Sequence, residues 1–257
     1  MTKVPTDPQI CKPTLPEAVN AADWLAVDWL ATTGRQPIES LCAIPGSSIR
    51  LHHDVLPALS RIQADAQRNG FTIAIASGYR SFDRQLMIWN GKATGERQVL
   101  DSDGQIMDTS LLSDEELLFA ILRWSAIPGC SRHHWGSDMD VYDSAAVSAG
   151  YNVQLTTAET TGEGPFAPLH HWLDTYLASD ECEFFRPYAH DRGGIAPERW
   201  HLSHWPTAKQ YERCLDEGRL IDWLMTQDIA LKSSIYKHWN TLFHRYVLVD
   251  HHAGTFR

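Results

Sequence analysis

The decapeptide SRHHWGSDMD, residues 131–140, decides how this chain must fold. Its last three residues alternate like a β-strand, so Asp138 and Asp140 share one face while the residue between them points to the core. His133 precedes the strand, and Gly136 lets the backbone bend so that this imidazole can fold back toward Asp140. The stretch therefore gathers an imidazole and two carboxylates, which are metal-binding groups, around one strand end.

A second polar stretch, ERWH at residues 198–201, lies about sixty residues further along the chain. It supplies another imidazole, His201, and another carboxylate, Glu198. Two neutral imidazoles, one carboxylate and an open position form the ligand set of a catalytic zinc site. Pro197 indicates that Glu198 is still in the loop before a short strand, where it can lean over a metal held by His201. There it would accept a proton from an activated water and pass it to a leaving amine.

A third candidate group follows the strand predicted over residues 71–76. The chain turns there through SGYR, residues 77–80, and strand ends often present functional side chains. Arg80 is the best-placed arginine to bind a developing oxyanion or a substrate carboxylate. A structural ion pair is the alternative role for this residue.

The overall composition restricts the function classes. The chain has 257 residues, 43% of them apolar, so it can bury a sizeable core. A formal net charge of −10 and the lack of a basic run argue against a nucleic-acid partner. No window is apolar and long enough for a membrane span. The N-terminus has no secretory signal and the five cysteines show no paired spacing, so we expect a cytoplasmic protein, or a periplasmic one if a signal has been removed.

Short strands interleaved with helices favour a single α+β domain over residues 1–257. Strands are predicted over residues 71–76, 138–142 and 200–205. We expect the core over residues 51–205, with helical additions over residues 1–50 and 206–257. Capping boxes that predict helix starts are found at Thr14–Glu17 and Ser113–Glu116. The strongest apolar stripe after Pro206 consists of Ile235, Trp239, Leu242, Phe243 and Tyr246.

Three motifs together resemble the zinc D-alanyl-D-alanine carboxypeptidase and dipeptidase family, which is related to the vancomycin-resistance peptidases. SRHHWGSDMD is similar to the family signature S-x-H-x-x-G-x-A-x-D, with Asp138 where the family has alanine. ERWH is similar to a second signature, and SGYRS with Gln85 is similar to a third. The likeness runs from about residue 51 to residue 204. It implies a small antiparallel β-sheet flanked by helices.

The resemblance also assigns roles to individual residues. It implies that zinc is bound by His133, Asp140 and His201, and that Glu198 is the catalytic base. The residues that it implies for substrate binding are Arg80, Ser131, Ser77, Tyr79 and Gln85. Asp138 and Trp200 are candidates for supporting the ligands without touching the metal. The remaining histidines are expected to be structural, and His52 with His53 is expected to form a surface pair.

These observations predict a zinc-dependent D-alanyl-D-alanine carboxypeptidase that removes the C-terminal D-alanine from peptidoglycan-type peptides. A dipeptidase for free D-alanyl-D-alanine, or a peptidoglycan endopeptidase, would use the same site. A non-catalytic zinc-containing binding module is the alternative from another class, and the presence of Glu198 and Arg80 argues against it. The sequence leaves substrate length, the oligomeric state and the role of the terminal helices open.

Overall fold

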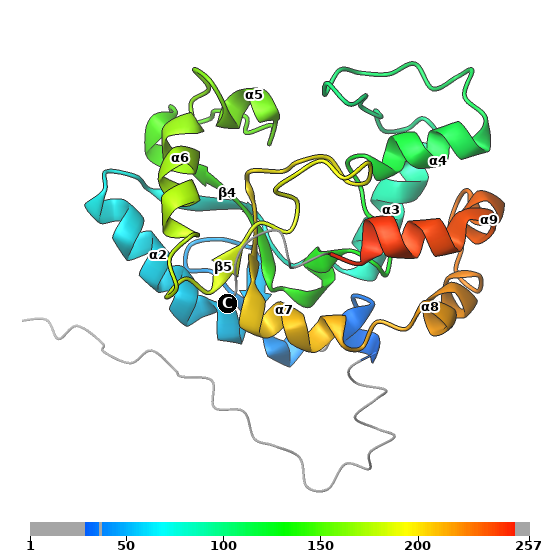
Figure 1. Ribbon diagram of the computed structural model, residues 1–257, viewed down its shortest axis with the longest axis horizontal. Helices are drawn as coiled ribbons and strands as arrows, with labels where there is room; N and C mark the ends of the chain where they lie inside the picture. The colour runs from blue at the N-terminus through cyan, green and yellow to red at the C-terminus, as the bar shows by residue number, and fades with distance from the viewer. Residues whose placement is uncertain (1–28, 36–37, 250–257) are drawn as a thin grey trace, which may run out of the picture.

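The computed structural model describes residues 29–35 and 38–249, and the account below concerns these residues (Figure 1). The capping box predicted at Thr14–Glu17 lies outside them. Within the described residues, no helix is long and apolar enough to cross a membrane. The architecture is α+β, as predicted, with helices arranged around a small antiparallel sheet.

The centre of the fold is a four-stranded antiparallel sheet in the order β3-β4-β6-β5. Its strands are β3 (Ile73–Ser77), β4 (Asp138–Asp143), β5 (Phe184–Phe185) and β6 (His201–His204). The three predicted strands correspond to β3, β4 and β6, with ends that agree within two residues. A separate two-stranded sheet consists of β1 (Leu41–Ala43) and β2 (Arg50–His52).

One face of the four-stranded sheet is apolar and is covered by two helices, α2 (Leu56–Arg68) and α6 (Ala167–Tyr176) (Figure 1). The fully buried side chains that the sheet and these helices share include Ile62, Met139, Val141, Leu169 and Leu202. Because side chains alternate along a strand, this packing directs Asp138 and Asp140 to the opposite face. The predicted alternation of β4 is confirmed.

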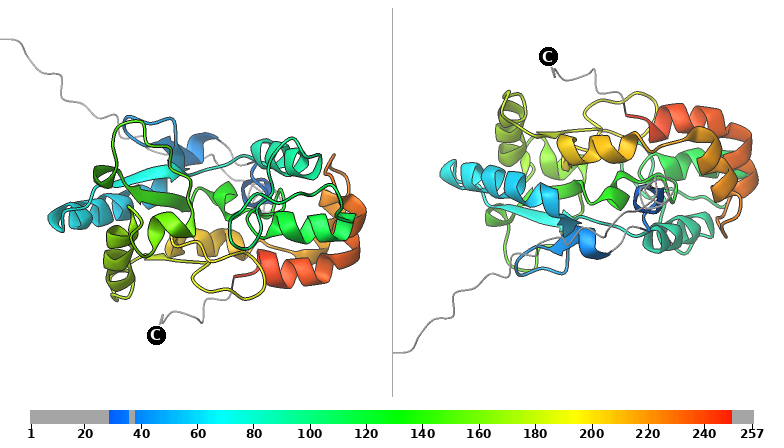
Figure 2. Two further views of the ribbon diagram at one scale, coloured as in Figure 1. Left: turned by 90° about the horizontal axis from the view of Figure 1, so that it is seen from above. Right: turned by 90° about the horizontal axis from the view of Figure 1, so that it is seen from below.

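A second core forms among helices that lie away from the sheet. They are α3 (Phe82–Ala93), α4 (Asp114–Leu122), α8 (Glu217–Leu224), α9 (Lys232–Leu242) and the π-helix at Phe243–Val247. Figure 2 shows this helical group at one end of the molecule and the α2–α6 side of the sheet at the other. The predicted apolar stripe from Ile235 to Tyr246 is buried in the helical core, and α4 begins with the predicted Ser113 capping box. The short helix α5 (Thr157–Thr160) lies near α6, and α7 (Trp205–Glu212) follows β6 directly.

Candidate active site

Three potential ligands meet on the polar face of the sheet, where β4 runs beside β6. Asp140 and His201 are directly opposite each other in the antiparallel register, so their side chains leave the same face side by side. His133 belongs to a short 3-10 helix, η3 (Arg132–Trp135), which ends at Gly136. Gly136 has φ +65° and turns the chain into β4, so that His133 Nε2 lies 3.4 Å from Asp140 Oδ2. His201 Nδ1 lies 3.1 Å from Asp140 Oδ1.

These three residues fit a divalent metal ion such as zinc. One nitrogen of each imidazole and one carboxylate oxygen lie within 4.8 Å of one another, and all three side chains are buried. His133 Nδ1 donates to the carbonyl of Gly78 at 2.9 Å, which leaves the Nε2 lone pair directed at the group. Asp140 Oδ1 and His201 Nδ1 are buried without a hydrogen-bond partner in the part of the chain that the structure describes. Such atoms are rare, and a bound cation would satisfy both.

Asp138 stands behind His201 and does not belong to the ligand group. Its Oδ1 lies 3.3 Å from His201 Nε2, so this nitrogen donates to Asp138 while Nδ1 faces Asp140. Arg132 Nε donates to the same oxygen at 2.9 Å. Burial alone would raise the pKa of Asp138, but the charge of Arg132 and the hydrogen bond from His201 hold it well below its usual value. A carboxylate in this position fixes the tautomer and orientation of a metal-binding histidine.

Arg132 is a residue of this motif that the sequence interpretation missed. Its buried guanidinium forms ion pairs with Asp138 and Glu212 and lies 4.7 Å from the ring centroid of Trp135. Glu212 comes from α7, 80 residues further along the chain, and no local pattern signals a contact at that separation. Arg132 therefore ties the turn before β4 to α7.

Glu198 lies beside the ligand group without joining it. It is in the loop before β6, as Pro197 predicts, and its backbone N–H donates to the carbonyl of Tyr188 at 2.9 Å. Glu198 Oε2 lies 3.5 Å from His201 Nδ1. Burial raises the pKa of Glu198 to about 7. The charge of His201 lowers this pKa, and the negative charge of Asp140 raises it. A carboxyl group with this pKa can accept and return a proton near neutral pH.

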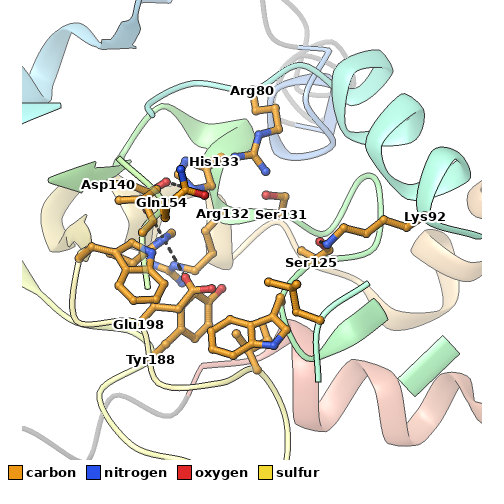
Figure 3. A pocket seen from close by; sticks show the side chains of 17 residues that line it. Arg80, Lys92, Ser125, Ser131, Arg132, His133, Asp140, Gln154, Tyr188 and Glu198 are labelled. Carbon is orange, nitrogen blue, oxygen red and sulfur yellow. Dashed lines mark hydrogen bonds and ion pairs between the residues drawn. The ribbon is translucent and has the colours of Figure 1, made fainter. Parts of the chain in front are cut away.

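A cavity of about 260 Å³ lies over the ligand group and Glu198. Figure 3 shows His133 and Asp140 at one side of it and Lys92 with Ser125 at the opposite side. Between these two sides lie Arg80 and Ser131. Seven of the predicted site residues line this cavity, Ser131 and Trp200 among them, and so do the apolar side chains of Leu100, Trp124, Leu155 and Ile195.

Arg80 lines the cavity, but three predicted substrate-binding residues near it do not. Arg80 donates to Gln85 Oε1 at 2.8 Å and to Ser77 Oγ at 3.3 Å, so these two side chains hold the guanidinium in place. Tyr79 OH donates to the carbonyl of Gly34 at 3.0 Å. In the structure Ser77 and Gln85 therefore position Arg80, and Tyr79 contacts the backbone at Gly34, while their predicted substrate contacts stay predictions.

Three further cavity residues, Lys92, Ser125 and Tyr188, were also missed by the sequence interpretation. Lys92 follows Gln85 by seven residues, or two helical turns, so both lie on the same side of α3. That spacing was the available signal for Lys92. Ser125 and Tyr188 lie in irregular segments, where no periodicity indicates the direction of a side chain.

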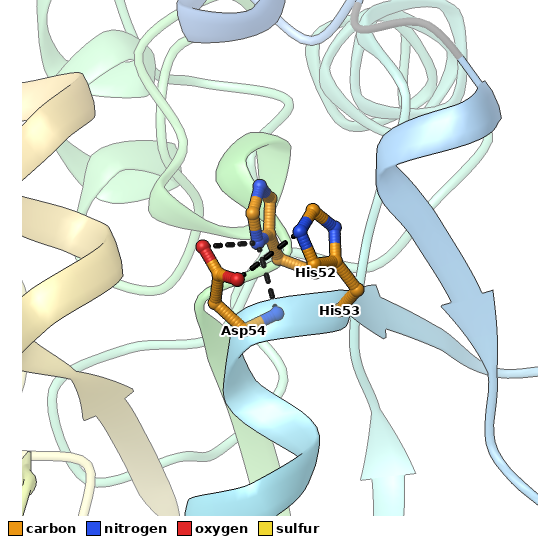
Figure 4. A group of neighbouring side chains, drawn as sticks. All are labelled: His52, His53 and Asp54. Carbon is orange, nitrogen blue, oxygen red and sulfur yellow. Dashed lines mark hydrogen bonds and ion pairs between the residues drawn. The ribbon is translucent and has the colours of Figure 1, made fainter. Parts of the chain in front are cut away.

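A second group of potential metal ligands, His52, His53 and Asp54, lies at the end of β2 and does not line the cavity (Figure 4). His52 is buried, which corrects the expected surface pair, whereas His53 is exposed. His52 Nδ1 accepts the backbone N–H of Asp54 at 3.3 Å, and burial lowers the pKa of His52 to about 4. The neutral imidazole of His52 therefore caps the next helical turn, and this role accounts for the group.

Comparison with known proteins relates the chain to a family of carboxypeptidases. Residues 48–207 match the family model described as VanY: D-alanyl-D-alanine carboxypeptidase. Two relatives from Haemophilus influenzae are both described only as uncharacterized proteins. One is 37% identical over 103 residues, which are 40% of this chain and 70% of that protein. The other is 25% identical over 124 residues, which are 48% of this chain and 93% of that protein.

Solved structures with similar folds include a mutant of the vancomycin resistance D,D-pentapeptidase VanY in complex with Zn(II). It has a TM-score of 0.47 and 18% identity, over 76% of this chain and 88% of that chain. VanYB in complex with D-alanine-D-alanine has the same TM-score and 21% identity, over 73% and 89% of the two chains. The LD-carboxypeptidase LdcB also has a TM-score of 0.47 and 21% identity, over 79% and 80%.

The family match covers more than half of the chain. It includes both motif stretches, the turn that carries Arg80, and the whole group formed by His133, Asp140, His201 and Glu198. The chain therefore belongs to the VanY family of D-alanyl-D-alanine carboxypeptidases.

Proposed function

We propose that this protein is a zinc-dependent D-alanyl-D-alanine carboxypeptidase that removes the C-terminal D-alanine from peptidoglycan-type peptides. The position of Glu198 carries the proposal, because this half-buried carboxyl group lies 3.5 Å from His201 Nδ1 and stays outside the ligand group. Withdrawing a carboxyl group partly from water costs stability. A module that only binds zinc has no need of it, whereas a hydrolase does.

The zinc ion would be held by His133, Asp140 and His201. When bound, it would act as a Lewis acid that polarises the scissile carbonyl and makes a water molecule acidic near neutral pH. Both imidazoles must be neutral to serve as ligands. Burial lowers the pKa of His133. Burial would also lower the pKa of His201, but its hydrogen bond to Asp138 and the adjacent Asp140 carboxylate raise it to about 10, so His201 would release a proton when the metal binds.

The side chains around this group divide the remaining chemistry. Glu198 would take a proton from the attacking water and deliver it to the amide nitrogen as the C–N bond breaks. The water oxygen stays in the new carboxylate, and D-alanine leaves as a free amino acid. Arg80, held by Gln85 and Ser77, would donate to the carbonyl oxygen as negative charge develops there.

Product analysis by mass spectrometry tests this proposal. The zinc-loaded protein is incubated with a pentapeptide ending in D-alanyl-D-alanine, with the free dipeptide and with a crosslinked peptide. We expect release of one D-alanine from the pentapeptide. Glu198→Gln should keep about one zinc ion per chain and lose turnover by about 10²- to 10⁴-fold, the usual contribution of general acid–base catalysis.

Glu181 offers a matched control, since it is an exposed glutamate outside the cavity. Glu181→Gln should cleave the pentapeptide at the wild-type rate. A Glu198→Gln protein that remained fully active would remove the proposed mechanism. Cleavage of the crosslinked peptide or the dipeptide in preference to the pentapeptide would assign a different substrate to the same site.

A further inference from the structure

The end of the cavity opposite the ligand group carries a second positive charge. Lys92 lies in the last turn of α3, and its Nζ donates to Ser125 Oγ at 2.7 Å (Figure 3). Ser125 follows α4, so two separate elements build this end of the cavity. Arg80 lies between Lys92 and the ligand group, and both cations line the same cavity.

Neither cation has a carboxylate within 4.0 Å among the residues that the structure describes. Arg80 donates to the neutral side chains of Gln85 and Ser77, and Lys92 donates to the neutral hydroxyl of Ser125. Burial lowers the pKa of both cations, and the charge of Glu198 opposes this effect only in part. Burying two cations even partly without a paired anion costs stability. The arrangement therefore indicates a ligand that brings negative charge of its own.

A lysine near the end of a helix is often a solvated residue that interacts favourably with the helix dipole. That role does not explain Lys92, whose ammonium group lines the cavity and donates to another element. The helix that carries it is also held firmly. Trp89 Nε1 donates to the carbonyl of Ala230 at 3.1 Å, and Asn90 Nδ2 donates to the carbonyl of Asp228 at 2.8 Å. The position of Lys92 is thus fixed by tertiary contacts.

A peptide with a free C-terminus has two oxygen groups that need positive charge. The scissile carbonyl oxygen becomes negative during the reaction, and the α-carboxylate lies one residue beyond it. Of Arg80 and Lys92, Arg80 is nearer the ligand group in Figure 3, so it would face the carbonyl. We propose that Lys92, together with Ser125, binds the α-carboxylate of the residue that leaves.

Ser125 complements the ammonium group in this role. Its oxygen accepts from Lys92, and its hydroxyl proton has no other acceptor within the described ranges, so it can donate to the second carboxylate oxygen. This inference rests on the proposed carboxypeptidase function and deepens it. On this proposal the cavity selects a free C-terminal carboxylate and disfavours a peptide whose last residue carries an amide in its place.

Binding measurements test the role of Lys92 without depending on turnover. The zinc-loaded Glu198→Gln protein is titrated in a calorimeter with D-alanyl-D-alanine and with its C-terminal amide. We expect tighter binding of the free acid. Adding Lys92→Met should weaken binding of the acid by roughly 10- to 100-fold, which is the usual loss of affinity when a hydrogen bond between charged groups is removed. Binding of the amide should stay nearly unchanged.

Lys237→Met is the matched control, because Lys237 is exposed and pairs with Glu115 at 2.6 Å. It should change neither affinity. Equal weakening of the acid and the amide by Lys92→Met would reveal a structural role and overturn the proposal, as would unchanged binding of the acid. Turnover of the pentapeptide by the wild type is measured separately. Its absence would end the carboxypeptidase proposal, whereas Lys92-dependent preference for the acid would still support the carboxylate site.

Discussion

Replacing Asp138 by asparagine removes one buried negative charge and keeps the shape of the side chain. Asp138 Oδ1 accepts from Arg132 Nε and His201 Nε2, and Oδ2 accepts from the hydroxyl groups of Ser137 and Ser203. An asparagine can keep its oxygen toward Arg132 and His201 and donate its amide to the two serines. Because all these hydrogen bonds can be retained, the substitution isolates the effect of the charge.

The magnitude follows from the surroundings of Arg132. This side chain is 2% exposed, and in Asp138→Asn only Glu212 would remain as its ion-pair partner. Removing one partner of a buried ion pair costs about 3–5 kcal/mol, and the retained Glu212 places the expected loss near the low end, at about 3 kcal/mol. For a chain of this length each kcal/mol lowers Tm by about 2–4 °C, so the expected decrease is about 6–12 °C. Zinc affinity should fall about 10- to 100-fold, since the carboxylate supports His201.

Thermal unfolding followed by circular dichroism and competition with a chelator measure these two effects. Asp180→Asn is a suitable control, because Asp180 is exposed and distant in sequence from the site. A Tm of Asp138→Asn within about 2 °C of the wild type would refute the view that Asp138 neutralises Arg132. Unchanged zinc affinity would refute its role in orienting His201, whatever the change in Tm.

Three other perturbations have expected outcomes. Removing zinc from the loaded protein with a chelator should lower Tm in scanning calorimetry, because two buried ligand atoms are then left without partners; an unchanged Tm would count against the site. Gly136→Ala should destabilise the protein by at least about 1–3 kcal/mol in urea unfolding, since the residue has φ +65° and its added Cβ would lie 2.8 Å from the backbone nitrogen of His52. Burial and the charge of Arg186 lower the pKa of His170 to about 3, whereas its unfolded value is about 6.5, so the unfolded state binds more protons between these values. The wild type should therefore lose about 2 kcal/mol more stability than His170→Leu between pH 7 and pH 5, and equal losses would contradict the assignment.

The local features of the site could be predicted from the sequence because each depends on short-range geometry. Strand alternation places Asp138 and Asp140 on one face, and a glycine is required where the chain turns with positive φ. Pro197 places Glu198 in a loop before the strand that carries His201. These rules depend only on neighbours along the chain, and the structure agrees with them.

The charged residues that complete the site could not be predicted in this way. The position of Arg132 is explained by its ion pair with Glu212, and that of Lys92 by its hydrogen bond to Ser125. Both contacts join elements that are far apart in the chain. Such pairings depend on how helices dock, which local periodicity does not determine. The hydrogen bond from Arg80 to Gln85 could not be predicted for the same reason, because the direction of a side chain at a helix start depends on its tertiary neighbours.

The two cores of the molecule supply different parts of the site. The sheet carries the potential metal ligands, and α3, which packs in the helical core, carries Lys92. Asn90 Nδ2 of α3 donates to the carbonyl of Asp228, and the N–H of Ala230 donates to Asn90 Oδ1 at 2.9 Å. Residues 228 and 230 lie beyond the family match, which ends at residue 207. The C-terminal segment, expected as an addition to the core, therefore fixes the cavity wall that carries Lys92, so the proposed recognition of the substrate carboxylate would depend on a region that the metal-binding motifs do not contain.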